Sequence, residues 1–223
     1  MRELVIYGAG DLGREYVWFI EGINAKSPCW KIRGFVDDEI PAGTVVYGIP
    51  VLGPRDYLLH AEQETAVVCS IAVPSIKRRI VEALSGCPWI VYPSLIHPTA
   101  VVAPDLVLGE GSVIAPGCVV SIETTIGRHV IVNQHTSISH NVTVGDYAMI
   151  APACQLGGWV QIGAGVDMGV GCTVKMEARI GQDAVLGAGA VVVKDIPPRC
   201  TAVGVPARPI KYHVEETACT KNT

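Results

Sequence analysis

The stretch from residue 96 to residue 197 reads IHPTAV VAPDLV LGEGSV IAPGCV VSIETT IGRHVI VNQHTS ISHNVT VGDYAM IAPACQ LGGWVQ IGAGVD MGVGCT VKMEAR IGQDAV LGAGAV VVKDIP. It divides into seventeen six-residue blocks without an insertion or deletion, and each block begins with an aliphatic residue. The fifth residue is usually small or β-branched, and the second is often glycine. A short repeat of fixed length predicts a solenoid, in which no block folds alone.

The repeat also predicts which side chains are buried. Three blocks make a triangular coil of eighteen residues, in which first positions point inward and fifth positions fill the space beside them. Glycines at the second positions, such as Gly109, Gly127 and Gly163, are expected to permit corners with positive φ. Residues eighteen apart in sequence should stack about 5 Å apart along the axis, at the usual spacing of strands.

Composition excludes several classes of partner. The net charge is −4 and no run of Lys or Arg occurs, so nucleic acid is not an expected partner. No apolar stretch is long enough to cross a membrane and no signal peptide is recognisable, which predicts a cytoplasmic protein without membrane insertion. The eight cysteines include no Cys-x-x-Cys pair. Cys118, Cys154 and Cys172 occupy fifth positions, so we expect core thiols and no metal site.

The N-terminal region begins with a pattern typical of nucleotide binding. Residues 4–7 read as a buried strand and lead into Gly8-Ala-Gly10-Asp-Leu-Gly13, which should open a helix extending to about residue 22. A second strand over 30–36 ends at Asp37-Asp38. This order predicts a nucleotide-binding βαβ unit, with phosphate at the helix N-terminus and the acids reaching the ribose or base. The alternative is a purely structural tight turn.

The remainder of this region completes only a small α/β unit. Helices are expected over 54–61 and 75–84, and strands over 66–71 and 89–91. About ninety residues make half of a dinucleotide-binding fold, which disfavours NAD. We therefore predict a Rossmann-like nucleotide-binding domain at 1–92, a solenoid domain at 93–212, and a disordered tail at 213–223.

The segment 132–141 is the densest polar cluster of the repeat. His140 occupies a third position, outside the coil, and Gly158 lies eighteen residues further on at the same corner. A histidine that accepts a proton next to a glycine N–H that stabilises an oxyanion is the arrangement that acyl transfer requires. The alternatives are a solvated surface histidine at 140 and, for His135, a structural role.

Taken together, these motifs resemble the left-handed parallel β-helix of the hexapeptide-repeat acyltransferases. The order of a small nucleotide-sugar domain, the repeat and a Gly204-Val-Pro-Ala-Arg208 exit is similar to bacterial sugar acyltransferases of the PglD/NeuD type, over residues 2 to 212. The resemblance implies transfer of acetyl from acetyl-CoA to a sugar, often a UDP-linked 4-amino-4,6-dideoxy sugar in glycan biosynthesis. The implied acceptor group is an amine or a hydroxyl.

The same resemblance implies roles for individual residues. The family's Asn-x6-His motif matches Asn133 and His140, with His140 as general base, and its Gly-Gly step matches Gly157-Gly158. The residues implied for catalysis are His140, Asn133, Gly158 and Asn141. Those implied for CoA binding are Gly158, Gly163, Ala188, Lys194 and Arg208. Those implied for nucleotide-sugar binding are Gly8, Gly10, Gly13, Asp37 and Asp38.

Four positions depart from the family pattern. Asn141 stands where an acidic residue commonly follows the histidine, so it orients the imidazole but stabilises an imidazolium less. Met149 replaces a second histidine of some 4-amino-sugar enzymes, and Asp11-Leu12 replace a Gly-His pair in the nucleotide loop. These departures leave the acceptor sugar open.

The repeat geometry further predicts an oligomer. Asn133 and His140 fall on different corners of one coil, roughly 15 Å apart, so they share a site only across subunits. A homotrimer meets that condition and agrees with the family. Other functions remain open: O-acetylation of a sialic-acid-like sugar, or a non-catalytic hexapeptide protein for binding or assembly. A γ-class carbonic anhydrase is disfavoured, because His129, His135 and His140 are not spaced to share a zinc ion.

Overall fold

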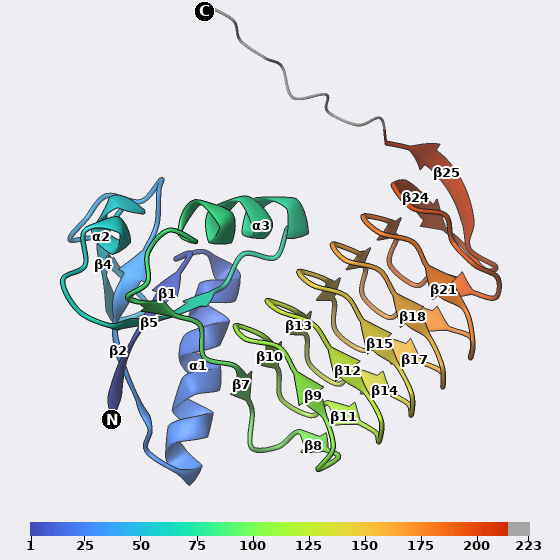
Figure 1. Cartoon of the computed structure of the whole chain (residues 1–223), viewed down its shortest axis with the longest axis horizontal. Helices are drawn as coiled ribbons and strands as arrows, with labels where there is room; N and C mark the ends of the chain where they lie inside the picture. The colour runs from blue at the N-terminus through green and yellow to red at the C-terminus, as the bar shows by residue number, and fades with distance from the viewer. Residues whose placement is uncertain (214–223) are drawn as a thin grey trace, which may run out of the picture.

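The computed structural model describes residues 1–213 and begins with an α/β region (residues 1–92) built on one six-stranded sheet (Figure 1). The strand order is β3-β4-β2-β1-β5-β6, and every neighbouring pair is parallel except β3 and β4. Its elements are β1 (Arg2–Tyr7), α1 (Asp11–Lys26), β2 (Trp30–Val36), β3 (Val45–Val46), β4 (Ile49–Gly53), α2 (Asp56–Leu59), β5 (Thr65–Cys69), α3 (Pro74–Ala83) and β6 (Ile90–Val91).

This region confirms the predicted order of strand, glycine loop, helix, strand and acidic pair. The β3–β4 hairpin was not predicted, because β3 has only two residues and its turn residues Tyr47 and Gly48 are not a common hairpin pair. The helix predicted over 54–61 is limited to the four residues of α2. Both differences lie in short elements, where hydrophobic periodicity carries little information.

The rest of the described chain is a left-handed parallel β-helix with three faces (Figure 1). Face 1 contains β7 (Leu95–Ile96), β10 (Val113–Ile114), β13 (Ile131–Val132), β16 (Met149–Ile150), β19 (Asp167–Met168), β22 (Val185–Leu186), β24 (Cys200–Val203) and the antiparallel β25 (Arg208–Tyr212). Face 2 contains β8 (Val101–Val102), β11 (Val119–Val120), β14 (Ser137–Ile138), β17 (Gln155–Leu156), β20 (Thr173–Val174) and β23 (Val191–Val192). Face 3 contains β9 (Val107–Leu108), β12 (Thr125–Ile126), β15 (Thr143–Val144), β18 (Gln161–Ile162) and β21 (Arg179–Ile180).

Three corners join these faces, and we name each by one residue. The Asn133 corner joins face 1 to face 2 and includes the turn at 133–136. The His140 corner joins face 2 to face 3 and includes the turns at 121–124, 139–142, 157–160 and 175–178. The His129 corner joins face 3 to face 1 and includes the turns at 127–130 and 145–148. The His140 corner is therefore the one opposite face 1.

The predicted eighteen-residue register is confirmed throughout the β-helix. Val113 pairs with Ile131, which in turn pairs with Met149. First-position side chains from Ile114 to Val192 are at most 3% exposed, and the three fifth-position cysteines are fully buried. Ile96, in the first block, is 38% exposed, because no preceding coil covers it. The core is therefore the one that the block pattern predicts, except at its open end.

The predicted role of the second-position glycines was wrong. Positive φ occurs instead at the fourth residue of each six-residue block from residue 111 to residue 189, whether that residue is glycine or not. The non-glycine examples are Glu123, His129, His135, Asn141, Tyr147, Ala153, Trp159, Glu177 and Asp183. Second-position glycines are required by close approach between coils: a Cβ on Gly109 would lie 2.5 Å from the carbonyl carbon of Gly127, and one on Gly163 2.5 Å from the nitrogen of Gln182.

The α/β region covers face 1 of the β-helix. The outward residues Val113, Ile131 and Met149 on this face are at most 8% exposed, whereas Val101 on face 2 and Val107 on face 3 are 66% and 59% exposed. One cluster of buried apolar side chains runs from the α/β sheet into the β-helix. Met149, one of the four positions noted for its residue type, is thus part of this covered face.

The predicted boundary at residue 92 falls between β6 and β7, and the division into two domains stays a prediction. Apart from His213, the predicted disordered tail lies outside the described residues. Within residues 1–213, no helix is long and apolar enough to span a bilayer.

Candidate active site

His140 projects into solvent from the turn at 139–142. Its Nδ1 lies 2.8 Å from Oδ1 of Asn141, and the Nδ2 of Asn141 donates to Oε2 of Glu123, one coil earlier. Because a carboxylate only accepts hydrogen bonds, the amide NH₂ of Asn141 must face Glu123 and its oxygen must face the imidazole. Nδ1 of a neutral His140 therefore carries the proton, and Nε2 presents a lone pair to a substrate.

Gly158 lies against this imidazole, as its spacing of eighteen residues predicts. A Cβ at Gly158 would come within 2.6 Å of Cε1 and 2.8 Å of Nε2 of His140, so a larger residue cannot occupy the position without displacing the ring. Among residues 1–213, no acceptor receives the N–H of Gly158, which is free to donate to an oxyanion. The half-exposed Trp159 closes one side, with its ring edge-on to the imidazole at 6.2 Å.

Asn133 lies at another corner of the same coil, as the repeat predicts. Its side chain is 5% exposed, and its Oδ1 accepts a hydrogen bond from the Gln134 N–H at 2.9 Å. The structure does not bring Asn133 to His140 within one chain, because the strand β14 separates their turns. His135, in the same turn as Asn133, has positive φ and packs over Gly117.

The residues implied for CoA binding are also distributed over the prism. Gly158 and Lys194 lie on the His140 corner. Gly163 lies on the His129 corner, Ala188 lies on the Asn133 corner, and Arg208 lies in β25. A pocket of about 600 Å³ lies beside Gly163 and is lined in part by Gln161 and Arg179. Within residues 1–213 these five residues lie on different corners or strands, and their assignment stays a prediction.

The glycine loop has the geometry that its motif predicts. Gly8 has a φ of 104°, and a Cβ at Gly13 would overlap the carbonyl oxygen of Gly8. Gly10 is the N-cap of α1; it makes no side-chain cap, and a Cβ there would meet no atom within 4 Å. The loop therefore leaves the first N–H groups of a sixteen-residue helix open to an anionic ligand.

Both acids at the end of β2 brace this loop. Oδ2 of Asp37 accepts the N–H of Ala9 at 2.8 Å, which ties the end of β2 to the glycine loop. Oδ2 of Asp38 accepts the Tyr7 hydroxyl at 2.6 Å, and its Oδ1 accepts the N–H of Arg55 at 2.8 Å. Burial and the hydrogen bond to Asp38 raise the pKa of Tyr7, so its hydroxyl remains protonated and donates to Asp38. Contact of either acid with a nucleotide stays a prediction.

A pocket of about 330 Å³ opens beside the glycine loop. It is lined by Asp11, Arg14, Glu15, Trp18 and Tyr47, the last from the unpredicted hairpin. The N–H of Gln134 Nε2 donates to Oε2 of Glu15 at 3.3 Å, so this side of α1 lies against the Asn133 corner. The glycine loop therefore lies on the side of the prism away from the same chain's His140.

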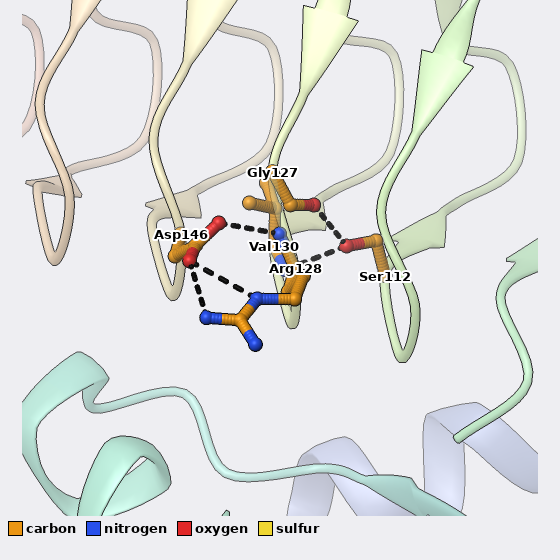
Figure 2. Close-up of polar contacts among 5 residues, drawn as sticks. All are labelled: Ser112, Gly127, Arg128, Val130 and Asp146. Carbon is orange, nitrogen blue, oxygen red and sulfur yellow. Dashed lines mark hydrogen bonds and ion pairs between the residues drawn. The ribbon is translucent and has the colours of Figure 1, made fainter. Parts of the chain in front are cut away.

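The His129 corner is built from contacts between coils and has a structural role. Asp146 accepts the backbone N–H of Arg128 at 2.8 Å and its guanidinium at 3.0 and 3.2 Å (Figure 2). Ser112 donates to the carbonyl of Gly127 at 2.7 Å and accepts the N–H of Val130 at 2.9 Å.

His129 itself is enclosed at this corner. It is 2% exposed, stacked on Tyr147 at 5.4 Å and edge-on to Tyr92 at 4.7 Å. Burial lowers the pKa of His129 to about 4, so the side chain is neutral at physiological pH. His129, His135 and His140 lie at three different corners and do not converge on one point.

Two residues of the His140 site were not singled out from the sequence. Glu123 precedes Asn141 by eighteen residues, so the register itself could have identified it. Trp159 follows Gly158 directly, but the orientation of its ring toward His140 has no signal in the sequence.

A left-handed β-helix with an exposed histidine beside a free glycine N–H defines an acyltransferase of the hexapeptide-repeat class. Comparisons with known proteins narrow this class. Residues 3–84 match the family model of the PglD N-terminal domain. A search of curated protein sequences gave no match.

Solved structures extend the similarity to 94% of this chain. The acetyltransferase domain of PglB from Neisseria gonorrhoeae FA1090 is 30% identical, with a TM-score of 0.86 over 94% of this chain and 100% of that one; it has also been solved with acetyl coenzyme A. PerB from Caulobacter crescentus, solved with CoA and GDP-perosamine, is 30% identical over 94% and 97%, with a TM-score of 0.84. WeeI from Acinetobacter baumannii AYE is 26% identical over 94% and 100%, with a TM-score of 0.77. The chain belongs to the family of PglD-type sugar acetyltransferases.

Proposed function

We propose that the protein transfers the acetyl group of acetyl-CoA to the amino group of a nucleotide-linked sugar, with UDP as the carrier, as a homotrimer in the cytoplasm. The observation that carries this proposal is the lone pair of His140 Nε2 next to the free N–H of Gly158. The similarity to PerB, whose structure holds CoA and GDP-perosamine, supports a nucleotide-linked amino sugar as the acceptor.

The reaction is a direct transfer. The amine nitrogen attacks the thioester carbonyl while Nε2 of His140 takes the proton that the amine loses. The Gly158 N–H donates to the oxyanion of the tetrahedral intermediate. The C–S bond then breaks, and the CoA sulfur leaves with the proton that the imidazolium returns. Base catalysis of this kind contributes about 10²–10⁴-fold to the rate. The buried thiols of Cys118, Cys154 and Cys172 take no part.

The placement of the two sites supports the proposed trimer. The glycine loop lies near the Asn133 corner, whereas His140 lies opposite face 1, on the far corner of the same prism. A nucleotide sugar held by one chain therefore meets His140 of the partner subunit. Ile122, Trp159 and Met176 on the His140 corner are each about half exposed, at 52%, 53% and 49%, which favours burial against another chain. The implied CoA residues, scattered in one chain, would be completed in the groove between two prisms.

The test is thiol release from acetyl-CoA with UDP-linked and GDP-linked 4-amino sugars and their hydroxyl counterparts. We expect turnover with an amino sugar, its loss in His140→Ala, and its retention in His60→Ala, which removes an exposed histidine in the α/β region. Turnover only with hydroxyl acceptors would assign O-acetylation. Binding of a nucleotide sugar without turnover would favour the non-catalytic alternative.

The shared site has its own test. Inactive His140→Ala chains mixed with inactive Asn133→Ala chains during refolding should regain activity, because some interfaces then pair an intact His140 with an intact Asn133. Failure to regain activity, with trimers shown by light scattering, would place both residues in separate sites.

A further inference from the structure

Glu123 forms the end of a chain of hydrogen bonds that leads to His140. It occupies the fourth position of its block, directly beside Asn141 in the next coil, and Asn141 Nδ2 donates to its carboxylate. Asn141 Oδ1 in turn accepts from Nδ1 of His140 at 2.8 Å. Glu123 is itself held in place, because its N–H donates to Oδ2 of Asp105 at 2.8 Å.

This arrangement resolves an ambiguity that Asn141 would otherwise have. A side-chain amide that rotates by 180° exchanges its donor and its acceptor, and would then present an NH₂ group to the imidazole. In that orientation Nδ1 of His140 would become the acceptor, Nε2 would carry the proton, and the general base would be lost. An obligate acceptor next to the amide disfavours this rotation, and Glu123 is such an acceptor.

The carboxylate also acts on the charge that develops during the reaction. When Nε2 takes a proton, the imidazole becomes cationic, and the amide dipole of Asn141 lies between this cation and the anion of Glu123. Hydrogen bonds in series polarise one another, so the anion acts on His140 although the two do not touch. The chain thereby has a carboxylate that supports the base, supplied from the preceding coil.

We propose that Glu123 is a positioning residue that acts through Asn141 to hold His140 in the tautomer and orientation required for proton abstraction. This rests on the proposed function of His140. It also supplies, through Asn141, a negative charge from the residue eighteen positions earlier.

The experiment compares three variants with the wild-type trimer. Glu123→Gln keeps the size of the side chain but lets Asn141 rotate, and we expect kcat to fall about 10-fold, as for other residues that orient a functional histidine, with KM unchanged. Glu123→Ala/Asn141→Glu places a carboxylate directly beside His140 and should regain kcat to within about 3-fold of wild type. Glutamate is compatible with the positive φ at 141, since Glu123 and Glu177 adopt it. Glu110→Gln, an exposed acid at another corner, is the matched control and should behave as wild type.

A spectroscopic readout separates this proposal from the proposed function. Nitrogen-15 shifts of the His140 ring report its tautomer without any substrate, and we expect the Nδ1–H form in wild type and a mixture in Glu123→Gln. An unchanged tautomer together with unchanged kcat in Glu123→Gln would overturn the proposal. Equal loss of stability and activity without rescue by the double variant would also overturn it, in favour of a structural role. A tautomer that shifts in a protein without transferase activity would refute the proposed function alone.

Discussion

His129 and His140 belong to the same repeat, yet they are opposite in character. Both lie in corner turns of the repeat, His129 at the fourth position of its block and His140 at the third, on a backbone that repeats every eighteen residues. His129 is enclosed between Tyr92 and Tyr147, whereas His140 is exposed and hydrogen bonded to Asn141. The difference arises from what covers each corner, because the α/β region packs against the His129 corner and leaves the His140 corner uncovered.

The contacts of α3 make this covering explicit. Arg78 donates to Asp183 at 3.1 Å and its guanidinium lies over the ring of Tyr147 at 5.5 Å. Lys77, one residue earlier, is 1% exposed next to the same corner. The three corners of the solenoid have similar backbones, and the His129 corner differs because the α/β region packs against it. Whether a histidine of the repeat is buried or exposed therefore depends on whether the α/β region packs over its corner.

The largest expected effect concerns stability at low pH and depends on His129. Its pKa of about 4 in the folded state lies below the ordinary 6.5, so below about pH 6.5 the unfolded chain takes up a proton that the folded chain does not. Stability is therefore lost as pH falls from about 6.5 to 4, by roughly 3 kcal/mol from this residue. Urea denaturation at pH 7 and pH 4.5 measures the difference.

His129→Asn removes the titrating group and keeps a residue that tolerates positive φ. The variant should lose the share of this pH dependence that His129 contributes, roughly 3 kcal/mol. An equal pH dependence in His129→Asn and wild type would mean that the two histidines differ less than their burial indicates.

The second prediction concerns the His140 corner and Gly158. Alanine here needs no unusual φ, but its Cβ would lie 2.6 Å from the His140 ring and push it aside. A displacement of about 1 Å in a catalytic group costs on the order of 100-fold, so kcat of Gly158→Ala should fall by about that factor. The unfolding free energy should change little, because the exposed imidazole can move into solvent. Gly86→Ala, where a Cβ meets no atom within 4 Å, is the control; full activity of Gly158→Ala would contradict the proposed contact.

The sequence predicted the solenoid, its register and the proximity of His140 and Gly158, because an exact repeat converts spacing into distance. It also predicted the conformation of the loop from Gly8 to Gly13. It did not predict which face of the prism is covered, since the apolar outward residues Val113 and Ile131 do not differ in type from exposed ones such as Val101. The eighteen-residue register could have predicted that Glu123 lies beside Asn141. It could not have predicted their hydrogen bond, because the block pattern does not contain the directions of side chains.

The smallest expected effect concerns Lys77, at the contact between α3 and the His129 corner. Its Nζ is buried without a hydrogen-bond partner among residues 1–213, and burial lowers its pKa to about 8. Below about pH 8 the lysine is charged in both folded and unfolded chains, so the folded state carries the full cost of burying the charge. As pH rises from about 8 to 10.5, the folded chain releases its proton first and this cost disappears.

Lys77→Met keeps the length of the side chain and removes the charge. We expect the unfolding free energy at pH 7 to rise by about 1–2 kcal/mol. This is less than the full desolvation cost, because burial already raises the pKa of Asp167 and the variant removes the Lys77 cation that opposes this shift. The gain should shrink toward pH 10.5, where wild-type Lys77 is neutral, and kcat should stay unchanged because the residue lies far from His140. A variant that is less stable than wild type at pH 7 would show that the charge of Lys77 holds the α/β region to the β-helix. The His129 corner would then depend on polar contacts as much as the His140 corner does.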